Sequence, residues 1–197
     1  MTEAGSIAGL TQLLHGRPPQ EAFNIWMRNV LIEEAWYRCD RGDRLLGFAE
    51  SVGIIREDLV PAVVECMRPI LAYAYPREQR AAHAMDVALA WHNKKATYDM
   101  AASAIDEVAG SYVGTGAASH HREAIRLMLT RPSVAVGHVA CAEFEREEHL
   151  ALRAGRSPQE ALAEGRRAQA ASLAASANVI REQIPIAWIL DGAERLS

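Results

Sequence analysis

Apolar residues recur along the chain at the three- and four-residue steps of an α-helix. The pattern is densest in the segment 81–110, where alanines are mixed with a few large apolar residues. Polar residues interrupt it at 93–95, so we predict two helices, or one sharply bent helix, that join near residues 92–97. The predicted inward-facing positions are Ala84, Met85, Val87, Ala88, Leu89, Trp91, His92, Tyr98, Ala101, Ala102, Ile105, Val108 and Ala109.

Proline, glycine and aspartate residues divide the N-terminal part of the chain into further helices. Asp43 follows a glycine in a polar turn and is predicted to cap the helix after it. Pro69 lies near the end of an apolar helical segment, which it is predicted to kink or terminate. The predicted helices of this part cover residues 6–15, 18–39, 44–52 and 57–73.

The C-terminal part contains the clearest helix boundary of the sequence. Gly155 suits a helix end, and Ser157, Pro158 and Glu160 form the pattern of a capping box with proline in the first turn. Pro185 ends the alanine-rich helix that follows. The predicted helices of this part cover 117–130, a segment that begins at Pro132, and 158–183. In the second of these, the residues predicted to be buried are Val134, Ala135, His138, Val139, Ala142 and Leu150.

These segments together predict an all-α fold. The 197 residues fit an irregular multi-helix bundle of roughly eight to ten helices. A solenoid-like stack is the alternative, although no fixed internal period stands out. We predict a single all-helical domain over 1–197, in which 157–197 could form a C-terminal helical appendage.

Composition and charge narrow the class of protein. Half of the residues are hydrophobic but only 6% are aromatic, because alanine is abundant, and this composition argues against disorder. The net charge is −4 and the basic residues are scattered, which argues against a nucleic-acid partner. No apolar run approaches the ~20 residues that cross a bilayer, and no secretory leader is evident. We therefore expect a cytoplasmic protein without a membrane partner.

The three cysteines, Cys39, Cys66 and Cys141, are far apart and lie in apolar helical contexts. They are predicted to be buried, reduced side chains, because they form neither a CxxC pair nor a metal-binding spacing. Cys141 follows His138 by three residues on the same helical face, so a Cys–His nucleophile is the alternative there. Its alanine neighbours favour an inert, buried thiol.

A metal site has to be considered because seven histidines accompany many carboxylates. Di-iron bundles carry Glu-x-x-His on two helices and zinc proteases carry HExxH, but here HExxH is absent and the His–carboxylate orders are reversed. We therefore predict no metal, no cofactor and no catalytic residue. The pairs at helical spacing, predicted to be ordinary helix decoration, are His83 with Asp86, His120 with Glu123, and Glu145 with His149.

The apolar tail after Pro185 is the segment for which a partner-binding role is predicted. It either docks on the bundle or contacts another protein, and tryptophan is a frequent anchor in protein interfaces. A homo-oligomer formed through this tail is one form that such a contact could take. The residues predicted to bind a partner are Trp188, Ile189 and Leu190.

Three stretches in about the middle third of the chain resemble a known family. They are Arg80–Trp91 (RAAHAMDVALAW), the small-residue helix 101–109, and Ser133–Ala142 (SVAVGHVACA) with its central histidine. All three are similar to the alanine-rich, all-helical immunity proteins found beside bacterial polymorphic toxins. The resemblance implies a cytoplasmic binding protein that occludes the active site of a toxin and performs no chemistry. It assigns no functional residue.

Three hypotheses of function follow. The first is a non-enzymatic protein-binding module, in particular an immunity-type inhibitor of a cognate toxin. The second is a helical structural or assembly protein, such as a phage component or a homo-oligomer. The third is a helical-bundle metal enzyme.

Overall fold

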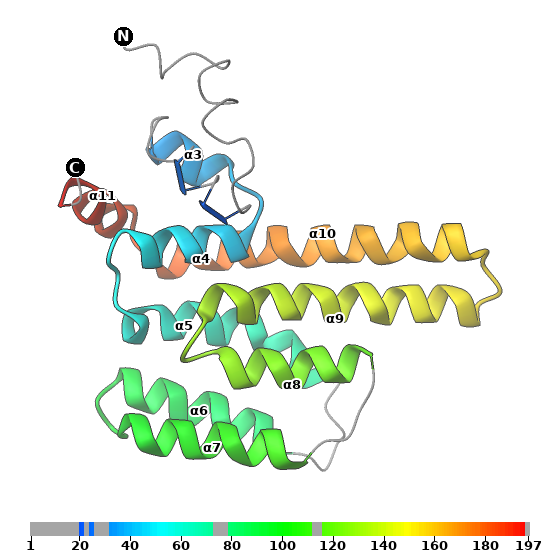
Figure 1. Ribbon diagram of the computed structural model, residues 1–197, viewed down its shortest axis with the longest axis horizontal. Coiled ribbons are helices and arrows are strands. Elements are labelled where there is room, and N and C mark those ends of the chain that lie inside the picture. Colours follow the sequence, from blue (N-terminus) through cyan, green and yellow to red (C-terminus); the bar gives the residue numbers. More distant parts are fainter. Residues whose placement is uncertain (1–19, 22–23, 26–31, 73–78, 112–115, 196–197) are drawn as a thin grey trace, which may run out of the picture.

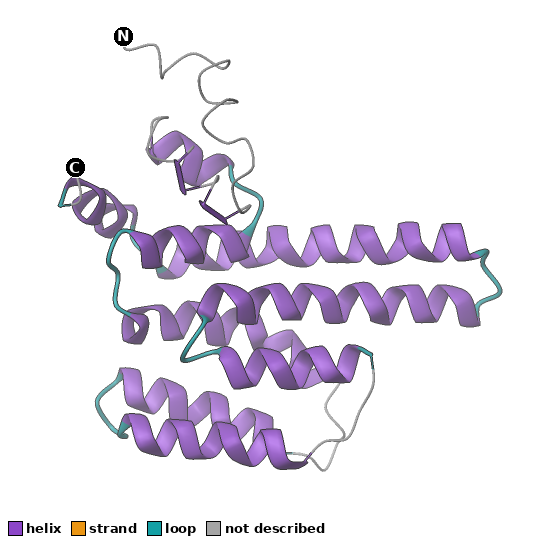
Figure 2. Ribbon diagram, viewed as in Figure 1, coloured by secondary structure: helices purple, strands orange, loops and turns teal. Residues whose placement is uncertain are grey.

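The computed structural model describes residues 20–21, 24–25, 32–72, 79–111 and 116–195. The predicted helix 6–15 and the greater part of 18–31 lie outside these described residues. Apart from short helical pieces at 20–21 and 24–25, the described residues form nine α-helices and one 3-10 helix and contain no strand, which confirms the all-α prediction (Figure 2). The helices are α3 (Ile32–Arg38), α4 (Gly42–Ser51), α5 (Arg56–Met67), η2 (Arg68–Ala72), α6 (Arg80–His92), α7 (Tyr98–Ser111), α8 (Ala117–Leu127), α9 (Pro132–Arg153), α10 (Pro158–Gln183) and α11 (Ile186–Glu194).

The long helices α9 and α10 run antiparallel and form the axis of an irregular bundle (Figure 1). α8 lies along α9, and α4 and α5 each pack against both long helices. The α6–α7 pair adds an outer layer against α5 and α8, and α11 contacts α3. The described helices range from 7 to 26 residues, so no structural unit repeats as it would in a solenoid.

The boundaries of α9 and α10 follow from local chemistry. Pro132 occupies the first turn of α9, where its missing N–H costs no helical hydrogen bond. Gly155, with φ of +79°, forms the turn between the two helices. The predicted capping box is confirmed: the Glu160 N–H donates to the Ser157 hydroxyl, and the Ser157 N–H donates to the Glu160 carboxylate.

Small residues let other helices approach α10 closely. At Gly165, an added Cβ would lie 2.9 Å from both the ring and the carbonyl oxygen of Phe144 on α9. At Gly42, the first residue of α4, it would lie 2.5 Å from the Cβ of Ser176 and 2.8 Å from its carbonyl carbon. The Cys66 thiol of α5 donates to the Ser176 carbonyl at 3.7 Å. Three neighbouring helices therefore depend on small side chains at their contacts with α10.

Arg181 of α10 holds α3 against the bundle. Its Nε donates to the Trp36 carbonyl at 3.0 Å, and its guanidinium also donates to the Cys39 carbonyl. Trp36 lies in the last turn of α3 and Cys39 directly follows the helix, where carbonyl groups have no partner within the helix. Trp36 is only 1% exposed, so this end of α3 is fixed by packing as well as by hydrogen bonds.

The chain also differs from the sequence-based predictions. α4 begins at Gly42 after Arg41, and Asp43 does not cap it, because the Asp43 carboxylate accepts two hydrogen bonds from the Arg41 guanidinium. Leu150 and Tyr98 were predicted to be buried but are 46% and 44% exposed. Leu150 lies where α9 extends beyond α8, and Tyr98 begins α7 at the edge of the outer layer (Figure 1).

Other boundaries agree with the predictions. The turn between α6 and α7 lies at 93–97, within the segment predicted to join two helices. α5 ends at Met67, and the 3-10 helix that follows contains Pro69. Proline near the end of this segment therefore terminates the α-helix, as predicted.

Two glycine substitutions should shift stability in opposite directions. Gly42→Ala should lower the free energy of unfolding by about 1–3 kcal/mol, because its Cβ would overlap the backbone of Ser176. Gly137→Ala is the control, since a Cβ in this interior position of α9 meets nothing within 4 Å, and it should raise stability by about 0.5–1 kcal/mol. Urea denaturation followed by circular dichroism measures both, and equal effects of the two variants would contradict the close α4–α10 contact.

Candidate functional site

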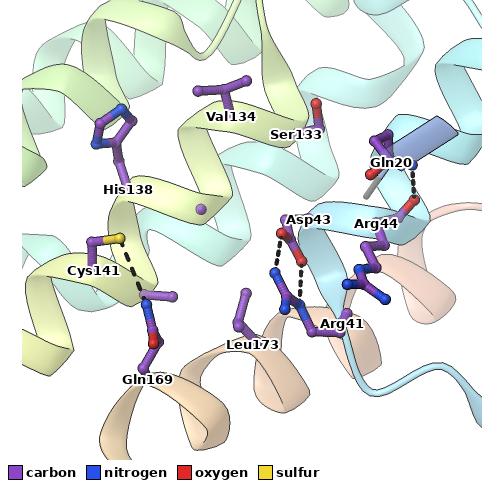
Figure 3. A pocket seen from close by; sticks show the side chains of 12 residues that line it. Gln20, Arg41, Asp43, Arg44, Ser133, Val134, His138, Cys141, Gln169 and Leu173 are labelled. Carbon is purple, nitrogen blue, oxygen red and sulfur yellow. Dashed lines mark hydrogen bonds and ion pairs between the residues drawn. The ribbon is translucent and has the colours of Figure 1, made fainter. Parts of the chain in front are cut away.

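A cavity of about 500 Å³ opens between α4, α9 and α10 (Figure 3). Its polar wall is largely satisfied from within the chain. Arg41 Nε and Nη2 donate to the two carboxylate oxygens of Asp43 at 3.0 and 2.7 Å, and this pairing raises the pKa of Arg41. Gln20 Nε2 donates to the Arg44 carbonyl at 3.1 Å and to Asn24 Oδ1 at 2.9 Å. These contacts leave little unmet hydrogen-bonding capacity for a small polar ligand.

Cys141 lines the same cavity but is not arranged as a nucleophile. Its sulfur accepts a hydrogen bond from Gln169 Nε2 at 3.7 Å, and Figure 3 shows the His138 ring directed away from it. Burial raises the pKa of the Cys141 thiol and outweighs the opposite effect of Gln169. An activated cysteine needs a lowered pKa and an adjacent base, so this geometry favours the inert thiol over the Cys–His alternative. Cys141 is half-buried rather than buried, which differs from the prediction.

Two histidines, His120 and His138, meet across helices, a contact that the sequence analysis did not predict. His120 Nδ1 of α8 lies 2.9 Å from His138 Nδ1 of α9, and His120 Nε2 lies 3.3 Å from Glu145 Oε1, also on α9. His138 and Glu145 are seven residues apart, two helical turns on one face, so this spacing was the signal available in the sequence. Glu123, the predicted partner of His120, instead accepts a hydrogen bond from Arg126 at 2.8 Å.

A metal centre finds no geometric support in the described part of the chain. There, no group of three or more His, Cys, Asp and Glu side chains converges in a way that could hold a metal ion. His83 and Asp86, which were considered as a pair, are both exposed on α6. His149 is likewise exposed, while Glu145 turns to His120.

A second groove, of about 600 Å³, lies between α5, α9 and α10. Its charged side chains are paired: Arg146 Nη2 lies 2.9 Å from Glu143 and 2.7 Å from Glu147, and Arg167 lies 2.6 Å from Glu164. Cys66 lies at the floor of this groove, where burial raises its pKa to about 12. The charged side chains that line this groove therefore neutralise one another, and its other lining residues are mostly small.

Large apolar side chains are exposed on several segments that are far apart in the sequence. The described residues include seven large apolar side chains that are exposed, and five of them belong to α3, α7, α11 and the α4–α5 connection. In Figure 1, α11, the α4–α5 connection and the start of α7 lie toward one end of the long axis, with α3 above α4 and α7 on the other side of the bundle. We call these five side chains together the apolar end; they are Tyr37, Ile55, Tyr98, Met100 and Trp188, which are 56%, 59%, 44%, 55% and 43% exposed. The other two, Leu150 and Leu152, lie near the tip of the α9–α10 hairpin at the opposite end.

Specific contacts hold the segments of the apolar end together. Lys94, in the α6–α7 turn, forms an ion pair with Glu57 near the start of α5, and His92 Nδ1 lies 3.0 Å from the Glu57 carbonyl oxygen. Gly192 of α11 packs against Val52 at the end of α4, where an added Cβ would lie 3.1 Å from the Val52 Cβ. α11 also contacts α3. The apolar end is therefore assembled from segments that are far apart in the sequence.

The C-terminal tail forms α11 and is divided between core and surface. Ile189 is fully buried and belongs to the hydrophobic core, so its side chain holds α11 on the bundle and is not presented to a partner. Leu190 is half-buried. Trp188 is exposed, and its predicted role in binding a partner stays a prediction.

No family model matches the chain, and neither a curated protein nor a solved structure matches it. In the residues that the structure describes, no helix combines the length and the apolar character needed to cross a membrane. A function for this chain is therefore inferred from its own geometry.

The thiols should react slowly in the folded protein. Burial raises the pKa of Cys39, Cys66 and Cys141, so each holds less thiolate at neutral pH than a free cysteine does. We expect iodoacetamide to label Cys141 more slowly than free cysteine and to leave Cys66 unlabelled, as followed by mass spectrometry of peptides. In denaturant all three should react at the same rate, and rapid labelling of folded Cys141 would contradict an inert thiol.

Proposed function

We propose that this chain is a non-enzymatic protein-binding module whose apolar end contacts a partner protein. The observation that carries the proposal is that five of the seven exposed large apolar side chains among the described residues belong to the segments of the apolar end. Large exposed apolar patches on folded proteins are typical of interaction sites. Tyrosine and tryptophan, which supply three of its five side chains, are the residues that most often carry interface binding energy.

The character of the apolar end favours a protein over a small ligand. Small-molecule sites are concave and enclose most of the ligand, whereas Tyr37, Ile55 and Trp188 project from three separate segments. Ion pairs lie on or beside the same segments, such as Lys94 with Glu57 and Arg38 with Glu34. Protein interfaces commonly combine apolar contacts with charged residues at their rim.

An inhibitor of a toxin is the partner relationship that we favour. The resemblance of residues 80–91, 101–109 and 133–142 to immunity proteins implies it, and a module that blocks an active site needs no chemistry of its own. The cavity beside Cys141 supports this reading, since its thiol has a raised pKa and its Arg41–Asp43 pair is closed on itself. The three free cysteines fit a reducing compartment, so we propose a cytoplasmic location.

Trp188→Ala should weaken binding to the partner. Trp188 is exposed, and the loss of a tryptophan that anchors an interface typically raises Kd at least about tenfold. The partner to use is the purified toxin-like protein encoded by the neighbouring gene, and isothermal titration calorimetry measures the affinity. Circular dichroism establishes that the variant is folded.

Leu152→Ala is the matched control for this experiment. Leu152 is 45% exposed, close to the 43% of Trp188, but lies at the opposite end of the molecule. Its replacement should leave Kd unchanged. Equal losses in both variants, or no loss in either, would contradict the assignment of the apolar end, and sedimentation of the isolated chain as a stable dimer through Trp188 would replace the toxin by a second copy.

A further inference from the structure

The contact between His120 and His138 joins α8 to α9, and its geometry limits which ring nitrogens can carry protons. We propose that this imidazole pair is a pH-sensitive joint that holds α8 on α9 when neutral and loosens on acidification. The joint is distinct from the apolar end, and nothing in the partner-binding proposal depends on it.

The distance between the two rings limits how many protons they can share. Nδ1 of His120 and Nδ1 of His138 are 2.9 Å apart, the length of an N–H···N hydrogen bond, so one must donate and the other must accept. His120 Nε2 lies 3.3 Å from Glu145 Oε1, so the carboxylate faces this nitrogen. A neutral His120 that carries its proton on Nε2, toward Glu145, leaves Nδ1 bare to accept the N–H of His138.

Protonation of both rings would break this arrangement. Each Nδ1 would then carry a hydrogen, the two N–H groups would point at each other, and two positive charges would stand about 3 Å apart. Glu145 can compensate only the charge on His120, which lies between it and His138. The second positive charge, on His138, has no comparable partner at this contact.

The surrounding charged groups do not cancel the repulsion between two protonated rings. On α8, Glu123 attracts a charge on His138, but its carboxylate is bonded to the guanidinium of Arg126, which repels that charge. On α4, Arg41 and Asp43 neutralise each other, and α10 contributes the uncharged Gln169 and Leu173 to the cavity beside His138. Arg44 of α4 lines the same cavity as His138 and adds positive charge there, and on α9 Glu143 pairs with Arg146.

The direction of the pH effect follows from two histidines. Burial, and then the neighbouring His120, lower the pKa of His138 below its ordinary value of 6.5. Burial likewise lowers the pKa of His121, against the opposing effect of Glu143. The unfolded chain therefore binds these protons more readily than the folded one, so their contribution to stability is complete above pH 6.5 and is lost as the pH falls below it.

His138→Asn removes the titrating ring while keeping a polar atom near the position of Nδ1. Urea unfolding at about pH 7.5 and about pH 5.5 would be compared with His83→Asn, which removes an exposed histidine on α6. Acidification should raise the unfolding equilibrium constant about tenfold more in the wild-type chain and in His83→Asn than in His138→Asn. The same pH dependence in all three proteins would overturn the proposal.

A measurement on the wild-type chain keeps the test independent of whether the variant folds. Imidazole ¹⁵N chemical shifts at about pH 7.5 should show a hydrogen bond between the Nδ1 atoms of His120 and His138, and this signal should be lost at about pH 5.5. Hydrogen exchange, corrected for the intrinsic effect of pH, should show amides of α8 losing protection at about pH 5.5 before those of α10 do. An unchanged hydrogen bond between the two rings, or equal protection of α8 at both pH values, would overturn the joint.

Discussion

Close approach of helix backbones to α10 is the constraint on which the arrangement depends. Gly165 meets the ring and carbonyl of Phe144, and Gly42 meets the backbone of Ser176, so no larger residue fits at either glycine without displacing a helix. Dispersion contacts and the exclusion of water stabilise these close helix–helix contacts. A single added methyl group would force the helices apart. Alanine, which is abundant in the sequence, is similarly small. It allows short distances between helices where larger side chains would keep them apart.

Helix positions could be predicted because their signals are local. Proline at the start of α9, the capping box at Ser157 and the polar interruption after α6 all act within one or two turns. Burial was predicted less well, because it depends on where a neighbouring helix stops. Leu150 has the periodicity of a buried residue, but α8 does not extend along α9 far enough to cover it. The sequence contains no local signal for that length.

The contacts of the candidate sites were the hardest to predict from the sequence, because they form between segments that are distant in the chain. His120 meets His138 only because α8 folds back along α9, and the apolar end exists only because α11 and the α6–α7 turn reach the same end of the bundle. Periodicity placed Ile189 and Trp188 together in one apolar tail. Packing separates them, because neighbouring positions on a helix point about 100° apart, so one enters the core and the other faces out.

The tip of the α9–α10 hairpin has a practical consequence. Residues 152–160 are exposed, and the turn at Gly155 already has a left-handed backbone that tolerates a change of chain direction. The tip is also at the greatest distance along the molecule from the surface that carries Trp188 (Figure 1). A tag or fluorophore introduced after Gly155, ahead of the capping box, would give a handle for immobilisation that keeps the opposite surface open to solution.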